Sequence, residues 1–370
     1  MRHYTRHFGK RREPDRRKSD LINFSMAVQA LANMSTPAHP KIVYLFGAGA
    51  THAEIIESHH AKASDAKFLD EKGLLMDAVS RRVCEKARND GVFSQKIQNL
   101  LSPAGLSNVE LFISLVKNNQ IKSEVTIESL ENLIKKDISS RLRKSQRTKF
   151  YLHKSLMELH KESKKEALSG FISLNYDDIL EEAFIEIFEK KPDYGFSSVA
   201  QENNIPLLKL HGGFSLKYRK HHLPILTPGA NKNYLQLPYN FIWGRALELL
   251  IGCDILRVIG CSLSQNDIGL IDLLFKAHLE RDNPFEVQIV SFDPLDNKIK
   301  QQYGFLPNIK TATEIEGGIG GGIISDPAIR DHTTGSNPFK IWLKAKVEKM
   351  LTTKDLEGIQ NTTYLKMLLE

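Results

Sequence analysis

The sequence is poor in cysteine and tryptophan, and it has no long uninterrupted hydrophobic run. Its 370 residues include three cysteines, Cys84, Cys253 and Cys261, which lie far apart and form no C-x-x-C pair. This set excludes a disulfide framework and a four-cysteine zinc site, and it is typical of a protein in a reducing cytosol. We therefore expect a cytoplasmic protein.

The longest apolar region, residues 241–263, is interrupted by four charged side chains, Arg245, Glu248, Asp254 and Arg257. Charges at this density exclude a membrane-spanning helix, and no stretch resembles a signal peptide. With 41% hydrophobic residues the chain can bury a sizeable core. Its length indicates one large domain with an insertion, or two domains.

The net charge of +7 belongs almost entirely to the N-terminal tail. Residues 1–18 contain eight basic and two acidic side chains, which account for six of the seven net charges. A concentrated basic segment is typical of a solvated tail, and basic arms also bind nucleic acid. Both interpretations stay open, as does an upstream extension of a protein that starts at Met26 or Met34. The net charge of the whole chain therefore does not indicate that the folded domain is basic.

The rest of the chain is organised around Lys41–Phe46 and the segment that follows it, Gly47–Thr51. The first is a short apolar run rich in β-formers, which predicts a buried central strand. The second is Gly-Ala-Gly-Ala-Thr, after which a helical pattern begins. A strand, a glycine turn and a helix start are how α/β proteins hold the pyrophosphate of a nucleotide, because glycines allow close approach and the helix dipole attracts anions. The motif alone also fits a tight turn without a ligand, since it lacks a third glycine and a P-loop lysine.

Further apolar runs ending in polar or glycine-bearing turns indicate that this strand has parallel neighbours. The expected strands occupy residues 41–46, 170–174, 205–210, 254–260 and 286–292. Most of these turns are followed by a helix. One helix is expected after Asp178 as far as about Phe188, one over residues 241–251, and one after Asp267 as far as His278. The pattern predicts an α/β fold, a Rossmann-like doubly wound parallel sheet with a large helical insertion, whose ligands bind beyond the carboxyl ends of the strands.

These patterns divide the chain into three segments. Residues 1–38 are expected to form the basic tail and a linker, residues 39–330 the nucleotide-binding domain, and residues 331–370 a C-terminal helical segment. Residues 60–168 show helical periodicity, which is far more chain than a βα unit needs, and we interpret them as the insertion. The glycine-rich stretch 316–322 lacks the lysine and hydroxyl partners of a phosphate loop and is predicted to be a plain loop.

Polar residues with chemical potential follow the predicted strands. They are Asn175, Asp177, His211, Ser262, Asp267 and Asp293. Singly, each has a structural explanation: Asn175 and Asp267 suit helix starts, His211 suits a loop, and Asp293 suits a turn before proline. Together they would lie at one edge of one sheet, facing the glycine turn, which favours a functional site.

The order Gly-Ala-Gly-Ala-Thr, Asn-Tyr-Asp, Leu-His-Gly and Ile-Gly-Cys-Ser resembles the motifs of the sirtuin superfamily, over residues 41–293. The resemblance implies a Rossmann-like NAD site. The residues that it places around the pyrophosphate are Gly47, Ala48, Gly49, Ala50 and Thr51. It also implies that Gly260 and Ser262 flank the adenosine half, and that Asn175, Asp177 and His211 surround the nicotinamide ribose. Asp267 and Asp293, after the last two strands, complete the predicted binding residues.

The departures from protein-deacylating sirtuins are informative. The chain lacks the two C-x-x-C pairs of their zinc module, has Leu174 where they have glutamine, and has no GIPxFR-like segment after Thr51. With its helical insertion it resembles the bacterial sirtuin-like NADases of anti-phage defence. The resemblance implies that NAD is a substrate to be hydrolysed, without a metal, and makes deacylation the less favoured activity.

This chemistry fits the residue types. Cleaving the nicotinamide–ribose bond builds oxocarbenium character at C1′, and the leaving group is already cationic and needs no acid. His211 is the candidate base, Asn175 is expected to orient the water or a ribose hydroxyl, and Asp177 to hold the ribose or stabilise positive charge. A sensor that binds NAD or a derivative without turnover is the alternative. We also expect a homo-oligomer, assembled through the insertion and the C-terminal helix, with a HerA-type hexameric ATPase as first candidate partner. A lid over the NAD site is the other possible role of the insertion.

Overall fold

The structure is a computed structural model, and its residues from Pro40 to Glu370 form one compact unit. It describes residues 39–61, 68, 71, 73–90, 95–100, 108–118, 124–163, 165–197, 204–214, 226, 234, 236–263, 267–291, 297–311, 337–356, 359 and 362–370. The predicted tail and the glycine-rich stretch 316–322 lie outside the described residues. So does Asp293.

In the described part of the chain, six strands form one parallel sheet in the order β3-β2-β1-β4-β5-β6. The strands are β1 (Lys41–Phe46), β2 (Ala167–Ser173), β3 (Leu207–Lys209), β4 (Ile255–Ile259), β5 (Glu286–Val290) and β6 (Ile309–Thr311). This is the strand order of a Rossmann fold, with the direction of winding reversed beside β1. The predicted fold class is confirmed, and β6 is an additional edge strand that the sequence did not reveal.

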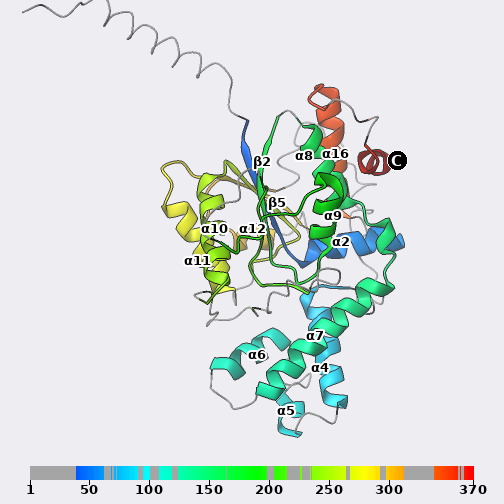
Figure 1. Cartoon of the computed structure of the whole chain (residues 1–370), viewed down its shortest axis with the longest axis vertical. Coiled ribbons are helices and arrows are strands. Elements are labelled where there is room, and N and C mark those ends of the chain that lie inside the picture. Colours follow the sequence, from blue (N-terminus) through cyan, green and yellow to red (C-terminus); the bar gives the residue numbers. More distant parts are fainter. Residues whose placement is uncertain are drawn as a thin grey trace, which may run out of the picture. The chain divides into compact units, whose positions relative to one another are not determined.

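Both faces of the sheet are covered by helices, because successive residues of a strand point to opposite faces. Ile42, Tyr44 and Phe46 of β1 belong to one buried cluster, whereas Val43 and Leu45 belong to another. The first cluster packs against α2 (Ala48–His59), α8 (Leu152–Glu162), α9 (Ile179–Phe188), α16 (Pro338–Thr352) and α17 (Tyr364–Leu369). The second packs against α10 (Tyr239–Gly252) and α11 (Ile268–Leu279), with α12 (Asn297–Gln302) before β6 (Figure 1).

Helices fill the segment between α2 and β2, where the sequence predicted the insertion. They are α4 (Met76–Asn89), α5 (Gln95–Leu100), α6 (Val109–Asn118), α7 (Glu124–Lys144), a 3₁₀ turn at Arg147–Lys149, and α8. Apolar residues of α4, α6 and α7 form a third buried cluster. These helices lie below the sheet in Figure 1. α8 differs from them because its Leu152 and Leu156 pack on the sheet.

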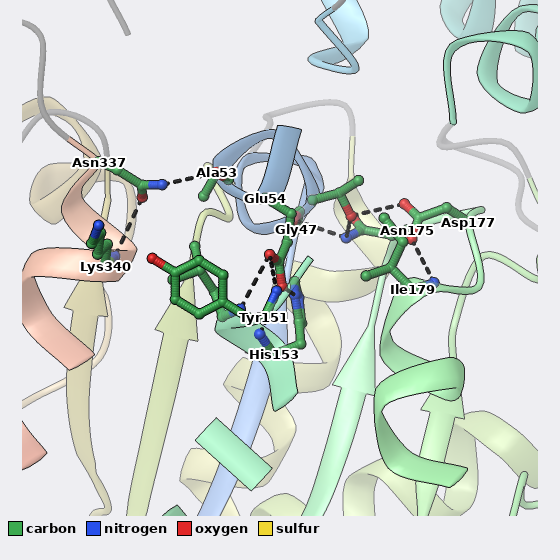
Figure 2. Close-up of polar contacts among 12 residues, drawn as sticks. Gly47, Ala53, Glu54, Tyr151, His153, Asn175, Asp177, Ile179, Asn337 and Lys340 are labelled. Atoms are coloured by element: carbon green, nitrogen blue, oxygen red, sulfur yellow. Dashed lines mark hydrogen bonds and ion pairs between the residues drawn. The ribbon is translucent and has the colours of Figure 1, made fainter. Parts of the chain in front are cut away.

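The helix that leaves the glycine turn is held by polar contacts to other helices (Figure 2). In α2 the buried carboxylate of Glu54 accepts hydrogen bonds from the backbone N–H groups of Tyr151, Leu152 and His153, at 2.8–3.1 Å. This places a negative charge at the positive end of α8. Asn337, which caps α16, donates to the carbonyl of Ala53 over 2.8 Å. These contacts fix the direction of α2, and with it the turn before it.

A buried polar cluster joins the middle of the sheet to α8 and α16. The guanidinium of Arg257 in β4 pairs with the Glu166 carboxylate and donates to the Tyr44 hydroxyl over 3.0 Å. Lys346 of α16 donates to the same carboxylate over 2.7 Å. Burial opposes the ionisation of Glu166, but Arg257 and Lys346 outweigh it and hold the pKa of this carboxyl well below its usual value. His160 of α8 lies 2.6 Å from the Tyr44 hydroxyl, and its burial lowers its pKa to about 3. These charges are paired, so the cluster fastens α8 and α16 to the sheet.

The C-terminal helix differs in one detail from the face expected from its sequence. The predicted apolar face, Ile341, Trp342, Ala345, Val347 and Leu351, placed Ile341 inward, but Ile341 is 40% exposed. The buried side chains of α16 are instead centred on Phe339, Trp342, Leu343, Val347 and Met350. The buried face of α16 is therefore rotated from the predicted one, so that Phe339, Leu343 and Met350 face inward and Ile341 does not.

Candidate active site

A cavity of about 330 Å³ opens at the carboxyl ends of β1, β2, β3 and β4. It is lined by Gly47, Ala48, Gly49, Thr51, Leu74, Leu75, Met76, Asp77, Asn108, Glu110, Ile138, Leu174, Asn175, Tyr176, Asp177, His211, Gly260, Cys261, Ser262 and Asp267. Ten of the twelve predicted site residues are in this set. Ala50 is fully buried behind the turn, and Asp293 lies outside the described residues. The volume is in the lower part of the range of small-molecule pockets.

The glycines of the turn are required by a close backbone packing that the sequence did not reveal. The N–H groups of Gly47 and Gly49 donate to the carbonyls of Ile259 and Gly260, over 3.1 and 2.8 Å. A Cβ on Gly47 or Gly49 would lie 2.6–2.8 Å from backbone atoms of Gly260 and Cys261. Gly260 itself has a φ of 58°, and a Cβ there would be 2.2 Å from Ala50 N. The glycines thus interlock the ends of β1 and β4, and two of the N–H groups expected to face a ligand are used within the protein.

Asn175 and Asp177, which follow β2, are joined to the turn through Thr51 (Figure 2). The Asn175 side-chain amide donates from Nδ2 to the Gly47 carbonyl over 3.0 Å and to Thr51 Oγ1 over 3.1 Å. Thr51 in turn donates its one hydroxyl proton to Asp177 Oδ2 over 2.8 Å. A carbonyl only accepts, and the Thr51 proton is used, so the amide of Asn175 has a single possible orientation. Its nitrogen points into the protein, and its Oδ1 is the atom that the site presents as an acceptor.

Asp177 also has a structural task. Its Oδ1 accepts from the N–H of Ile179 over 3.2 Å and so satisfies the first turn of α9. The side-chain acceptor at this helix start, which the sequence considered for Asn175, is therefore Asp177, the residue before the N-cap Asp178. The carboxylate lines the cavity while both of its oxygens are hydrogen-bonded, so its position there is fixed.

A buried ion pair supports the two loops that carry these residues. Lys209 of β3 donates to the backbone carbonyl of Asp177 and pairs with Glu181 of α9 over 2.8 Å. Burial raises the pKa of Glu181, an effect that Lys209 opposes. A Cβ on Gly213 would lie 2.9 Å from the Lys209 side chain, so the His-Gly-Gly loop packs directly on this lysine. The lysine thereby ties the loop after β2 to the loop after β3.

His211 follows β3 and is 4% exposed. Its Nε2 lies 3.1 Å from Oδ2 of Asp267, which is equally buried at the start of α11. The other oxygen of Asp267 accepts from the N–H of Leu270 over 3.3 Å and caps α11. The structure therefore brings together a histidine and a carboxylate that are 56 positions apart in the sequence.

The helices between α2 and β2 supply one wall of the cavity, including Asp77 at the start of α4 and Glu110 of α6. Glu110 accepts a hydrogen bond from the hydroxyl of Tyr176 over 2.7 Å. Burial and the neighbouring Glu110 carboxylate raise the pKa of Tyr176 well above its usual value, so the phenol stays neutral. The sequence analysis missed Tyr176, Glu110 and Asp77. Tyr176 could have been noticed because it lies between Asn175 and Asp177.

Within the described residues, no three His, Cys, Asp or Glu side chains are grouped as a metal site would require. The helices of the described part include none that is long and apolar enough to cross a membrane.

The chain shows similarity to a protein-family model and to solved structures. Residues 169–306 match the model of the SIR2-like domain, a stretch that includes Asn175, Asp177, His211, Gly260 and Asp267. No curated protein sequence gives a significant match. A structure concerned with the structural basis of sirtuin substrate affinity is similar at 12% identity and a TM-score of 0.30, over 72% of this chain and 86% of its own. A structure of Sir2Tm bound to a propionylated peptide has the same identity and TM-score, over 80% of this chain and 98% of its own. The similarity of this chain to a SIR2-like domain thus rests on residues 169–306.

Proposed function

We propose that the protein hydrolyses NAD to nicotinamide and ADP-ribose. The observation that carries the proposal is one cavity, at the carboxyl ends of the central strands, that holds the glycine turn together with Asn175, Asp177 and His211. The last three lie within the stretch that matches the SIR2-like domain, a domain that uses NAD. This is where an open α/β sheet binds its ligand.

The charge of the cavity suits the nicotinamide half of NAD. Four carboxylates line it, those of Asp77, Glu110, Asp177 and Asp267. The nicotinamide ring of NAD is a cation, and the positive charge moves to the ribose as the bond to C1′ breaks. Fixed negative charges near this path stabilise it in the transition state.

The residues then divide the hydrolysis among them. A water molecule forms a bond to C1′ while the bond from C1′ to the nicotinamide nitrogen breaks, and its electron pair leaves with the nicotinamide. Asn175 accepts a hydrogen bond at Oδ1 from the water or from a ribose hydroxyl, because its Nδ2 is held by Gly47 and Thr51. His211 takes the proton that the attacking water loses. The leaving nicotinamide is neutral and needs no proton.

The proposal is tested by incubating the full chain with NAD and separating the products by chromatography. We expect nicotinamide and ADP-ribose in equal amounts, and a loss of at least about a hundredfold in turnover for Asn175→Ala and His211→Ala. Asn283→Ala and His39→Ala are matched controls, because both side chains are exposed and remote from the cavity residues. Tight binding of NAD without products would instead establish a sensor. Full turnover by His211→Ala would show that His211 is not the general base.

The cellular part of the proposal rests on the resemblance to the NADases of anti-phage defence. The protein would act in the cytoplasm as an NAD-depleting effector, as a homo-oligomer, with a HerA-type ATPase or another defence protein as partner. Intracellular NAD should then fall after phage infection in cells with the intact protein and stay constant with His211→Ala. Light scattering tests the oligomer, and a monomer with full turnover would leave the insertion helices as a lid.

A further inference from the structure

Asp267, which the sequence predicts to contact the cofactor, lines the cavity and makes two contacts within the protein. Oδ2 lies 3.1 Å from His211 Nε2, and Oδ1 accepts from the N–H of Leu270. Both side chains are 4% exposed, so bulk water does not screen their interaction. From these contacts we infer that Asp267 is the positioning residue of His211, and that it fixes the tautomer and the orientation in which the imidazole meets the substrate.

Asp267 lies at the start of α11, where the helix dipole favours the carboxylate form of an acidic side chain. The N-terminus of a helix carries a partial positive charge, and α11 has twelve residues. An ionised carboxylate is only an acceptor, so the His211 nitrogen beside it carries the proton. The neutral imidazole therefore has its proton on Nε2 and its lone pair on Nδ1.

The same carboxylate assists the proton transfer. When His211 takes a proton from water, the imidazolium is formed 3.1 Å from Oδ2 of Asp267. A carboxylate at this distance stabilises the charged ring and raises its affinity for the proton. The other ionisable groups that line the cavity are Asp77, Glu110, Tyr176, Asp177 and Cys261. Burial raises the pKa of the Cys261 thiol to about 12, so it stays neutral. Tyr176, whose ring centre is 6.4 Å from that of His211, stays neutral.

The inference rests on the proposed hydrolysis, and Asp267→Asn tests it. Asparagine can still accept the hydrogen bond of Leu270, so α11 keeps its cap and the thermal midpoint should change little. Turnover should fall at least about tenfold while KM for NAD changes less than about threefold. The acidic limb of the pH–rate profile should move to lower pH, because the imidazolium has lost its counter-charge. Asp272→Asn is the matched control, since Asp272 lies on α11 with a half-exposed side chain and pairs with Lys276.

A measurement without NAD separates this inference from the proposed function. In protein labelled with ¹⁵N-histidine, the ring signals of His211 are assigned by their loss in His211→Gln. We expect the Nε2–H tautomer in the intact protein, and in Asp267→Asn a mixed tautomer with a titration midpoint at lower pH. If the intact protein hydrolyses no NAD but shows this shift, only the proposed reaction fails. An unchanged tautomer and midpoint in Asp267→Asn, or a higher KM with unchanged kcat, would overturn the positioning role.

Discussion

Thr51 is the residue on which the geometry of the candidate site depends most directly. Its side chain is 1% exposed, accepts from Asn175 and donates to Asp177. Thr51→Val keeps the shape and removes the hydroxyl, so one oxygen of a buried carboxylate loses its donor. Losing a hydrogen bond to a charged group costs about 1.5–3 kcal/mol. The free energy of unfolding should therefore fall by about 2 kcal/mol.

The same substitution should reduce catalysis by more than its effect on stability suggests. Without Thr51 Oγ1, the Asn175 amide is held by the Gly47 carbonyl alone and can rotate away from the orientation that presents Oδ1. A misplaced orienting group costs one or two orders of magnitude in turnover. Thr51→Ser is the control, because it retains the hydroxyl and loses one methyl group.

Urea unfolding and NAD turnover of the three proteins give the answer. We expect Thr51→Ser to resemble the parent in turnover and Thr51→Val to be weaker in both measurements. If Thr51→Val and Thr51→Ser unfold at the same urea concentration and turn over NAD equally fast, the hydroxyl does not organise the site.

Two further predictions concern the framework. Gly260→Ala should prevent folding or lower the free energy of unfolding by more than about 3 kcal/mol, because φ is positive there and the new Cβ would meet Ala50 N. Gly244→Ala, in α10 with open space around it, should raise the free energy of unfolding by about 0.5–1 kcal/mol. Equal denaturation midpoints for the two variants would contradict both expectations. Acid should destabilise the protein in two stages. Below pH ~6.5 His160 becomes protonated in the unfolded chain but stays neutral in the folded one. The free energy of unfolding should therefore fall by about 1 kcal/mol for each pH unit. Below pH ~4.5 the unfolded chain also protonates Glu166, whose folded pKa is depressed, so this further stabilisation is lost as pH falls. Urea unfolding measured from pH 7 to 4 should show that the free energy of unfolding falls less steeply with pH for His160→Gln than for the parent. Equal slopes would show that His160 is not kept neutral in the folded protein.

The central part of the fold follows from the sequence because its strands are short apolar runs that end in polar turns. The strand at Lys41–Phe46 has the bounds that the sequence predicted, and four others differ from their predicted ranges only at their ends. The edge strand β6, Ile309–Thr311, was missed because an edge strand needs no continuous buried run, and its middle residue is exposed. Local periodicity also gave no sign that α8 packs on the sheet, since that depends on tertiary contacts with Tyr44 and Phe171.

The candidate site was predictable where the sheet alone determines it. Parallel strands bring Asn175, Asp177 and His211 to one edge whatever the rest of the chain does. The contact between Tyr176 and Glu110 depends on how the insertion docks, which no spacing along the chain encodes. The pairing of His211 with Asp267 likewise depends on the start of α11 reaching the loop after β3.

The interlocked glycines also determine when the site can form during synthesis. Gly47 and Gly49 are made early, but their hydrogen-bond acceptors, the carbonyls of Ile259 and Gly260, come more than two hundred residues later. Closing so long a loop is entropically costly and depends on the strands between being paired. A nascent chain that has not yet passed residue 260 therefore lacks the turn, whatever structure its earlier segments have reached. The cavity that this turn lines can therefore form only once β4 has been synthesised and has paired with β1.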